Sequence, residues 1–146
     1  MSSQATVQSS LNLTNGNLQF RSAGPGAFNP TVTGTNGPTP GCVTVPVAGI
    51  DIEFSQLTAL GGLGQFYNID STNFITVGLR DILTNEFYPF IDVLPGESYV
   101  MRLSSKLPMH ETGTGTFSGS NAVVHAKTNT NPGNNSAKLI CNFFDM

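Results

Sequence analysis

The side chains in this chain that most readily support catalysis are two histidines, His110 and His125, and two nearby carboxylates, Asp51 and Glu53. Acyl transfer needs a nucleophile, an imidazole and an orienting acid that converge on one point. The chain has many serines but no Gly-x-Ser-x-Gly motif, which would mark a nucleophile on a strained turn. We therefore expect His110 to lie in a solvated loop and His125 on a strand face, and we assign neither a catalytic role.

Asp51 and Glu53 lie two residues apart, so on a strand both would project from the same face. A pair of carboxylates can hydrolyse glycosides when their environments separate their pKa values. Nothing in the neighbouring sequence indicates that either acid is buried. We expect both to lie on a solvated strand face.

Metal and phosphate sites are not predicted. A metal site needs a cluster of imidazoles and carboxylates, and the two histidines lie too far apart in the sequence to begin one. The glycine-rich stretch 113–119 precedes a predicted strand, whereas a phosphate-binding loop opens a helix. The sequence therefore predicts no catalytic, cofactor-binding or metal-ligating residue, no bound cofactor and no enzymatic activity.

The composition points to a structural role. The chain has 146 residues, with 6 Lys and Arg against 9 Asp and Glu, which gives a formal charge of −3. This balance argues against nucleic-acid binding, which requires clustered cations, and no apolar run is long enough to span a membrane. Charged residues make up 10% of the chain, where soluble domains average about 25%. Low charge favours surfaces that become buried against other proteins.

The cysteines and the first residues give information about the compartment. Cys42 and Cys141 are far apart and match no disulfide framework or zinc spacing, so we expect reduced, half-buried thiols, although a bridge between them stays open. Residues 1–6 lack the basic start and apolar run of a signal peptide. We expect synthesis in the cytosol without cleaved secretion.

Runs typical of β-strands alternate with Gly and Pro turn signals along the whole chain. They cover residues 6–13, 17–20, 42–47, 50–54, 65–69, 73–79, 87–93, 98–103, 121–127 and 137–144. Asn15-Gly16 predicts a type I′ hairpin with these two residues at its centre. Pro46 places the strand 42–47 at a sheet edge, because proline removes a ladder donor.

This pattern predicts an all-β fold, an antiparallel β-sandwich resembling a jelly roll, with about eight or nine strands. We expect one domain over residues 1–146, with residues 1–10 as an extended N-terminal arm. The first 55 residues and the rest of the chain are candidates for the two separate sheets of the sandwich.

Five short stretches carry a resemblance to a known group. They are residues 66–78 (FYNIDSTNFITVG), 86–90 (EFYPF), 94–103 (LPGESYVMRL), 125–130 (HAKTNT) and 137–139 (AKL). This pattern resembles small structural proteins of the virions of tailed bacteriophages and spans somewhat over half of the chain. Ser71 and Phe74 stand where alanine and tyrosine are commoner in that group.

The resemblance implies a virion component without enzymatic activity. A capsid decoration or cement protein is the first interpretation: a homotrimer, or another homo-oligomer, that binds the major capsid protein on the outer shell. A neck, tail or baseplate component that binds another virion protein is the alternative. A carbohydrate-binding module of a fibre ranks third, because the chain has no Trp and only 3 Tyr. The resemblance also implies that side-chain hydrogen bonds of Asx type hold the turn from Asn68 to Asn73.

Overall fold

A computed structural model describes residues 3–4, 6–8, 10, 12–21, 31–32, 37–54, 57, 63–104 and 122–144. Contacts between Cα atoms divide the chain into residues 1–33, here called the N-terminal unit, and residues 34–146, here called the body. All regular structure in the described ranges is β-strand, which confirms the all-β prediction. None of these ranges contains a helix able to cross a membrane. The single domain over residues 1–146 and the arm over residues 1–10 stay predictions.

In the part of the N-terminal unit that the structure describes, strands form two small antiparallel pairs. β1 (Ser3–Gln4) pairs with β4 (Thr31–Val32), and β2 (Asn12–Asn15) pairs with β3 (Leu18–Arg21). The predicted strand over residues 6–13 is therefore not formed as one element. Its last two residues, Asn12 and Leu13, begin the hairpin strand β2.

The hairpin between β2 and β3 corrects the predicted turn by one residue. Asn15 pairs with Leu18, so the two central residues are Gly16 and Asn17 rather than Asn15 and Gly16. Gly16 has a φ of 57°, whereas Asn85 is the one non-glycine residue with a positive φ in the described ranges. A positive φ at the first central residue alone is the type II′ pattern, which favours glycine there.

The described residues of the body form eight strands: β5 (Thr39–Pro46), β6 (Ile50–Asp51), β7 (Leu63–Asn68), β8 (Ile75–Asp81), β9 (Phe87–Val93), β10 (Ser98–Arg102), β11 (Ala122–Thr128) and β12 (Ser136–Phe144). Each lies at or beside a predicted run. The largest boundary differences are of three residues: β5 begins at Thr39 although its strand was predicted from Cys42, and β6 ends at Asp51 although its strand was predicted to Phe54.

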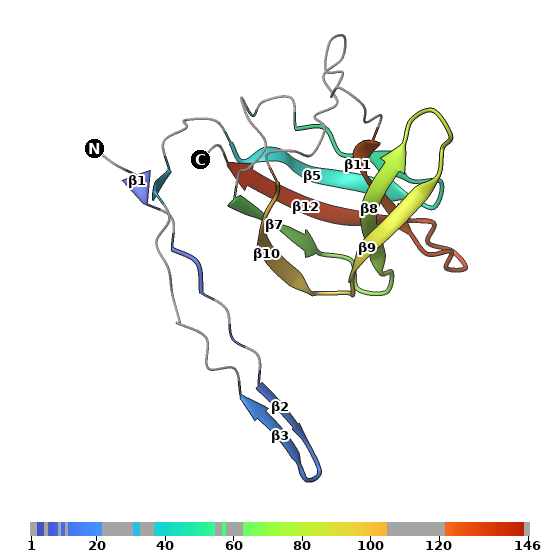
Figure 1. Ribbon diagram of the computed structural model, residues 1–146. Helices are drawn as coiled ribbons and strands as arrows, with labels where there is room; N and C mark the ends of the chain where they lie inside the picture. The colour runs from blue at the N-terminus through green and yellow to red at the C-terminus, as the bar shows by residue number, and fades with distance from the viewer. Residues whose placement is uncertain are drawn as a thin grey trace. The chain divides into compact units, whose positions relative to one another are not determined.

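These strands form two four-stranded antiparallel sheets (Figure 1). We call β10-β7-β12-β5 the first sheet and β6-β11-β8-β9 the second sheet. β5 lies at an edge of the first sheet, as the proline at its end predicted. The division of the sheets near residue 55 was wrong, because β5 and β6 are consecutive along the chain and belong to different sheets. Each sheet is assembled from both halves of the chain.

The turn between β7 and β8 is held by side chains. The Oδ1 of Asn68 accepts a hydrogen bond from the Asp70 amide at 2.9 Å, and the Oδ1 of Asp70 accepts from the amides of Thr72 and Asn73, both at 2.8 Å. These amide donors lower the pKa of Asp70 because they stabilise its charged form. The Asx-type bonds implied for residues 68–73 are present.

The chain passes from the second sheet to the first through the turn at residues 94–97. The Glu97 amide donates to the Leu94 carbonyl at 2.9 Å, and Gly96 has a φ of 78°. Proline at the second position and a positive φ at the third define a type II turn. The Gly96 amide also donates to the Asn68 carbonyl at 2.9 Å, which ties this turn to the end of β7.

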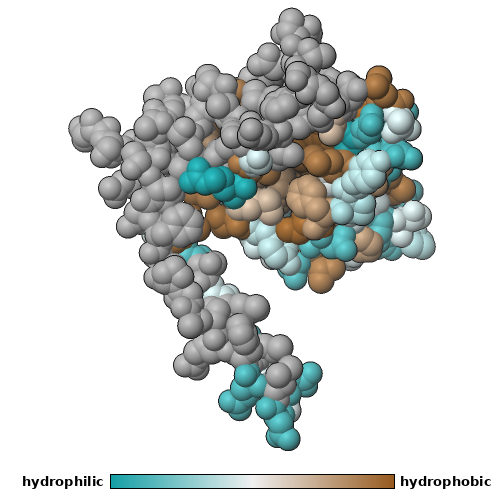
Figure 2. Space-filling model, in the orientation of Figure 1, coloured by the Kyte–Doolittle hydropathy of each residue, from teal (hydrophilic) through white to brown (hydrophobic). Residues whose placement is uncertain are grey.

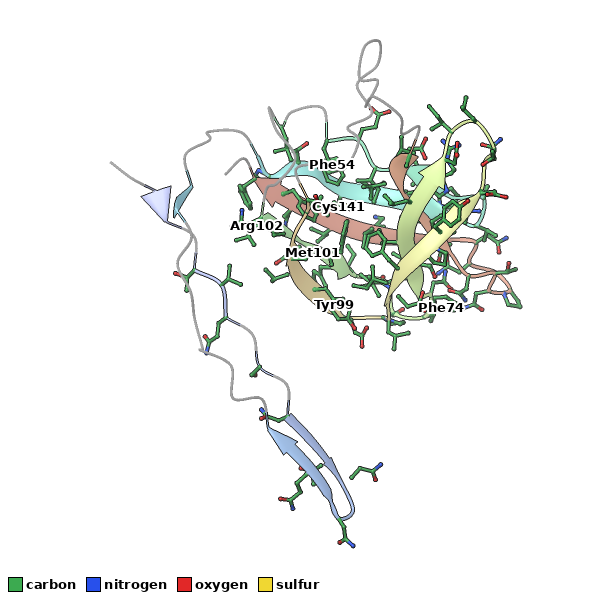
Figure 3. All side chains as sticks on the ribbon, viewed as in Figure 1. Phe54, Phe74, Tyr99, Met101, Arg102 and Cys141 are labelled. Carbon is green, nitrogen blue, oxygen red and sulfur yellow. The ribbon has the colours of Figure 1, made fainter. Side chains whose placement is uncertain are left out.

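One hydrophobic core draws on both sheets. Buried side chains recur at every second residue of β12, and the first sheet also contributes Val45 and Phe66. The second sheet contributes inward-facing residues of β8, β9 and β11. The core residues of β12 are Ala137, Leu139, Cys141 and Phe143, and those of β8, β9 and β11 are Ile75, Val77, Val93, Val124 and Ala126. Phe54 and Cys141 mark this core in Figure 3.

Both cysteines are free thiols, as expected, but they are not equally half-buried. Cys42 on β5 is exposed, whereas Cys141 on β12 is buried. Burial strongly raises the pKa of Cys141 because the apolar core disfavours the thiolate. Cys141 therefore serves as a core residue.

Candidate functional site

The outer face of the second sheet brings together two of the four residues considered for chemistry. Asp51 on β6 pairs with His125 on β11, and His125 pairs in turn with Gly78 on β8. The Nδ1 of His125 lies 2.6 Å from the Oδ1 of Asp51. Glu53 follows β6 and is exposed, and it is not one of the residues through which β6 pairs with β11. His110 lies outside the described residues.

Asp51 is not a freely solvated acid, which corrects the expectation for it. Arg80 on β8 binds both of its oxygens, with Nε 3.0 Å from Oδ1 and Nη2 2.5 Å from Oδ2. The remaining terminal nitrogen of Arg80, Nη1, donates to the Oδ1 of Asn85 at 2.7 Å. Planar guanidinium and carboxylate groups match in this two-point geometry, so Arg80 and Asp51 hold each other in fixed positions.

His125 lies on a face of strand β11, as expected, but it is only 5% exposed. Its ring packs against the Phe87 ring, with centroids 5.4 Å apart in a T-shaped arrangement. Its Nε2 is buried and has no hydrogen-bond partner in the part of the chain that the structure describes. Burial lowers the pKa of His125 and outweighs the opposing effect of Asp51. The neutral ring then carries its proton on Nδ1 and donates it to Asp51.

The pKa of Asp51 is also shifted. Burial raises it, but the hydrogen bonds from Arg80 and His125 and the positive charge of Arg80 together lower it below its ordinary value. The carboxylate therefore stays charged at neutral pH. An ionised acid beside a neutral imidazole is the arrangement that orients a general base, but a base also needs an accessible Nε2.

Gly49, in the turn between β5 and β6, closes the approach to that nitrogen. It has a φ of 90°, and a Cβ at this position would collide with the His125 ring and the Lys127 side chain. The glycine backbone thus lies directly against Nε2. In this conformation the Asp51–His125 pair fastens β6 to β11, and its second nitrogen is closed to a substrate from the Gly49 side.

Replacing Gly49 with alanine should destabilise the protein more than the same change at Gly133. Both glycines have φ near 90°, but a Cβ at Gly133 meets nothing within 4 Å. We expect Gly133→Ala to lower the free energy of unfolding by about 1 kcal/mol for backbone strain alone. Gly49→Ala should cost about 1 kcal/mol more, because overpacking adds to the strain. Urea unfolding of the two variants measures this difference, and equal losses would contradict the close contact with His125.

The lowered pKa of His125 predicts a loss of stability on mild acidification. Between the lowered value and the ordinary value of 6.5, the unfolded chain binds more protons than the folded one. The stability that the neutral His125 contributes above pH 6.5 is therefore lost as the pH falls toward the lowered pKa of His125 in the folded protein. Asp51 adds a loss in the same direction only below its ordinary value of 3.8.

Urea unfolding between pH 7.5 and pH 5.5 tests this expectation, and His125→Asn should flatten the dependence. His110→Asn, at the other histidine of the chain, is the control, and a slope that is lost in this variant instead would assign the titration to His110. A slope that His125→Asn leaves unchanged would show that another group titrates.

Sequence reasoning did not single out Arg80, Phe87 or Gly49. The alternation of β8 carried a usable signal, since Thr76, Gly78 and Arg80 fall on the face opposite the core residues Ile75 and Val77. Within the described ranges, no group of three His, Cys, Asp or Glu side chains could hold a metal ion. The glycine-rich stretch 113–119 lies outside those ranges.

Comparison of the chain with protein-family models, curated proteins and solved structures finds no match.

Proposed function

We propose that this chain is a structural component of a tailed-bacteriophage virion, and that its body is a jelly-roll sandwich. The observation that carries the fold is a nested set of strand pairs in the body. The first strand of the body pairs with the last, β5 with β12. The second pairs with the seventh, β6 with β11, and the fourth pairs with the fifth, β8 with β9. The third strand, β7, pairs with the sixth, β10.

This nesting is what results when a long antiparallel hairpin of eight strands rolls up into two sheets. Eight-stranded double-sheet jelly rolls occur in viral capsid proteins, lectins and cupins. Because one fold serves many functions, the strand order alone does not choose among these. The resemblance of residues 66–103 to virion proteins favours the first.

Within the virion, a decoration or cement role on the outer capsid shell is our first proposal. A protein that binds the assembled shell, but not its separated subunits, stabilises the shell by mass action. The body exposes large apolar side chains suited to such contacts, including Leu83 at 73%, Tyr88 at 56% and Phe90 at 51%. Figure 2 shows hydrophobic residues beside hydrophilic ones on the visible face of the body. A homotrimer bound to the major capsid protein is the expected assembly.

The sheet edges indicate where an extended segment of the partner could pair. Edge strands are protected when they are very short or carry proline or a bulge. β6 has two residues, β9 has Pro89 and a register shift, and β5 has Pro40 and Pro46. β10 has neither proline nor a register shift, and in the described ranges only β7 pairs with it. β10, whose Tyr99, Met101 and Arg102 appear in Figure 3, is a better candidate than the edge at residues 42–47.

Imaging of purified virions by cryo-electron microscopy, with an antibody against this protein, tests the proposal. Label over the whole head supports decoration, and the copy number gives the symmetry. Label confined to one vertex or to the tail would overturn decoration in favour of a neck, tail or baseplate component. Absence of label from virions would overturn the virion proposal itself.

Val100→Lys should weaken attachment to purified heads while leaving the fold intact. Val100 is 48% exposed in the middle of β10, so a lysine there meets solvent, and a charge on an edge strand opposes pairing with another chain. We expect about a tenfold loss of affinity in head-binding assays. Thr44→Lys, at an exposed position of β5, is the control and should bind as the wild type does. Equal affinities of the two variants would exclude β10 as the contact.

A glycan-binding module is a second candidate, because two of the three tyrosines are exposed beside carboxylates. The Tyr88 hydroxyl donates to Glu86, and the Tyr99 hydroxyl donates to Glu97 at 2.8 Å. These hydrogen bonds raise the pKa of both tyrosines. Binding of the isolated protein to a glycan array, lost in Tyr88→Ala and Tyr99→Ala, would favour this candidate over the shell-binding one.

A further inference from the structure

A hollow of about 410 Å³ lies on the outer face of the second sheet, beside the Asp51–His125 pair. It is lined by residues of the β5–β6 turn and of β6, β8 and β11, with Asn85 from the β8–β9 turn: Ala48, Gly49, Ile50, Asp51, Arg80, Asn85, His125 and Lys127. This volume falls within the range of about 300–1,000 Å³ that is usual for small-ligand sites. Most of its charged and polar groups are already held in place by the contacts described above.

The charges around the hollow are unequal. Arg80 and Lys127 supply two cations, and Asp51 supplies the one carboxylate of the lining. Both oxygens of that carboxylate are already used, Oδ1 by Arg80 and His125 and Oδ2 by Arg80. The neutral His125 adds no charge. The lining therefore has a net charge of +1 at neutral pH, on a chain whose formal charge is −3.

Lys127 is the cation left available for a ligand. Its Nζ lies 5.0 Å from the centroid of the Phe87 ring, and the described residues give it no carboxylate partner. An ammonium group over an aromatic face is attracted to it but keeps donors free for an anion. Arg80, fixed by Asp51 and Asn85, adds a second positive group in a set orientation.

We propose that this hollow binds a small oxyanion, a carboxylate or phosphate group, with Lys127 as the main contact and Arg80 as the supporting charge. The site is preorganised: Gly49 packs against His125, and the bidentate Arg80–Asp51 pair holds two further lining side chains in place. Preorganisation lowers the entropic cost of binding. The proposal does not depend on the virion function, because it concerns the chemistry of this face alone.

Titration of the full-length protein with sodium phosphate and, separately, with sodium acetate tests the proposal. Amide chemical shifts are followed at constant ionic strength, so that general screening does not imitate binding. We expect saturable shifts at residues 48–51 and 125–127, with a dissociation constant of about 1 mM for an anion of this size. Phosphate and acetate arms show which oxyanion geometry the hollow prefers.

Lys127→Met should weaken binding about tenfold, as expected for the loss of one charge-assisted hydrogen bond. Lys138→Met removes an exposed lysine of β12 in the first sheet, so it controls for the change in net charge. A Lys127→Met protein that binds as tightly as the Lys138→Met protein would overturn the proposal. Shifts that fail to saturate, or that spread evenly over surface lysines, would overturn it as well.

Discussion

Asn68→Ala is expected to lower the free energy of unfolding by about 3 kcal/mol, because it leaves several buried polar groups without partners. The Asn68 side chain is fully buried. Its Nδ2 donates to the carbonyls of Asn73 at 2.8 Å and Val93 at 2.9 Å. Its Oδ1 accepts from the Asp70 amide at 2.9 Å. Alanine removes all three hydrogen bonds and supplies none in return.

The position of Asn68 makes this loss larger than that of an ordinary turn residue. It ends β7 in the first sheet, while Asn73 leads into β8 and Val93 ends β9, both in the second sheet. One side chain therefore connects the ends of three strands across the two sheets. We expect the substitution to loosen the junction between the sheets as well as the turn itself.

Asn135→Ala is the matched control for this prediction. Asn135 lies in the β11–β12 loop and is exposed, so its substitution should change stability by less than about 0.5 kcal/mol. Chemical unfolding of both variants, compared by midpoint at equal slope, measures the difference. If Asn68→Ala matched Asn135→Ala, water would have to replace the lost partners at the junction.

The local elements of this fold were readable from the sequence. β9 has the predicted bounds, since a run of aromatic residues followed by the β-branched Ile91 and Val93 lies between two turn signals, which leave little freedom in where the strand ends. The type II turn at residues 94–97 follows from proline and glycine at fixed positions. Such features depend on neighbours within a few residues, which a single sequence contains.

The assignment of strands to sheets was not readable in the same way. β5 and β6 are joined by a short turn, a connection that commonly links partners in one sheet, yet they pair with β12 and β11 in different sheets. These partners lie far along the chain. Pairing at such separation is decided by the packing of the whole core, and no local pattern carries it.

The candidate site could not be predicted from the sequence for the same reason. The alternation correctly placed Asp51 and the apolar residue Ile52 on opposite faces of the strand. Whether the face of Asp51 is solvated depends on the side chains that neighbouring strands place on it. Arg80 is 29 residues away along the chain and His125 is 74 residues away. The sequence predicted a solvated Asp51 because the groups that bind this side chain become its neighbours only when the second sheet forms.

Phe143→Ala is expected to lower the free energy of unfolding by about 4 kcal/mol, as the loss of a buried aromatic side chain usually does. Phe143 on β12 is fully buried, and its ring centroid lies 5.3 Å from that of Phe54 and 5.0 Å from that of Phe66. Phe54 follows β6 of the second sheet, whereas Phe66 belongs to β7 of the first. The ring therefore packs where the two sheets meet, and alanine leaves a cavity that neighbours on both sides cannot fill.

Phe144→Ala separates the effect of burial from that of residue type. Phe144 is the next residue of the same strand and is 41% exposed, because successive residues of a strand point to opposite faces. We expect its loss to cost about 1 kcal/mol or less. Urea unfolding of the two variants gives the comparison. Similar losses would mean that β12 is displaced by one residue, since such a shift exchanges the buried and exposed faces.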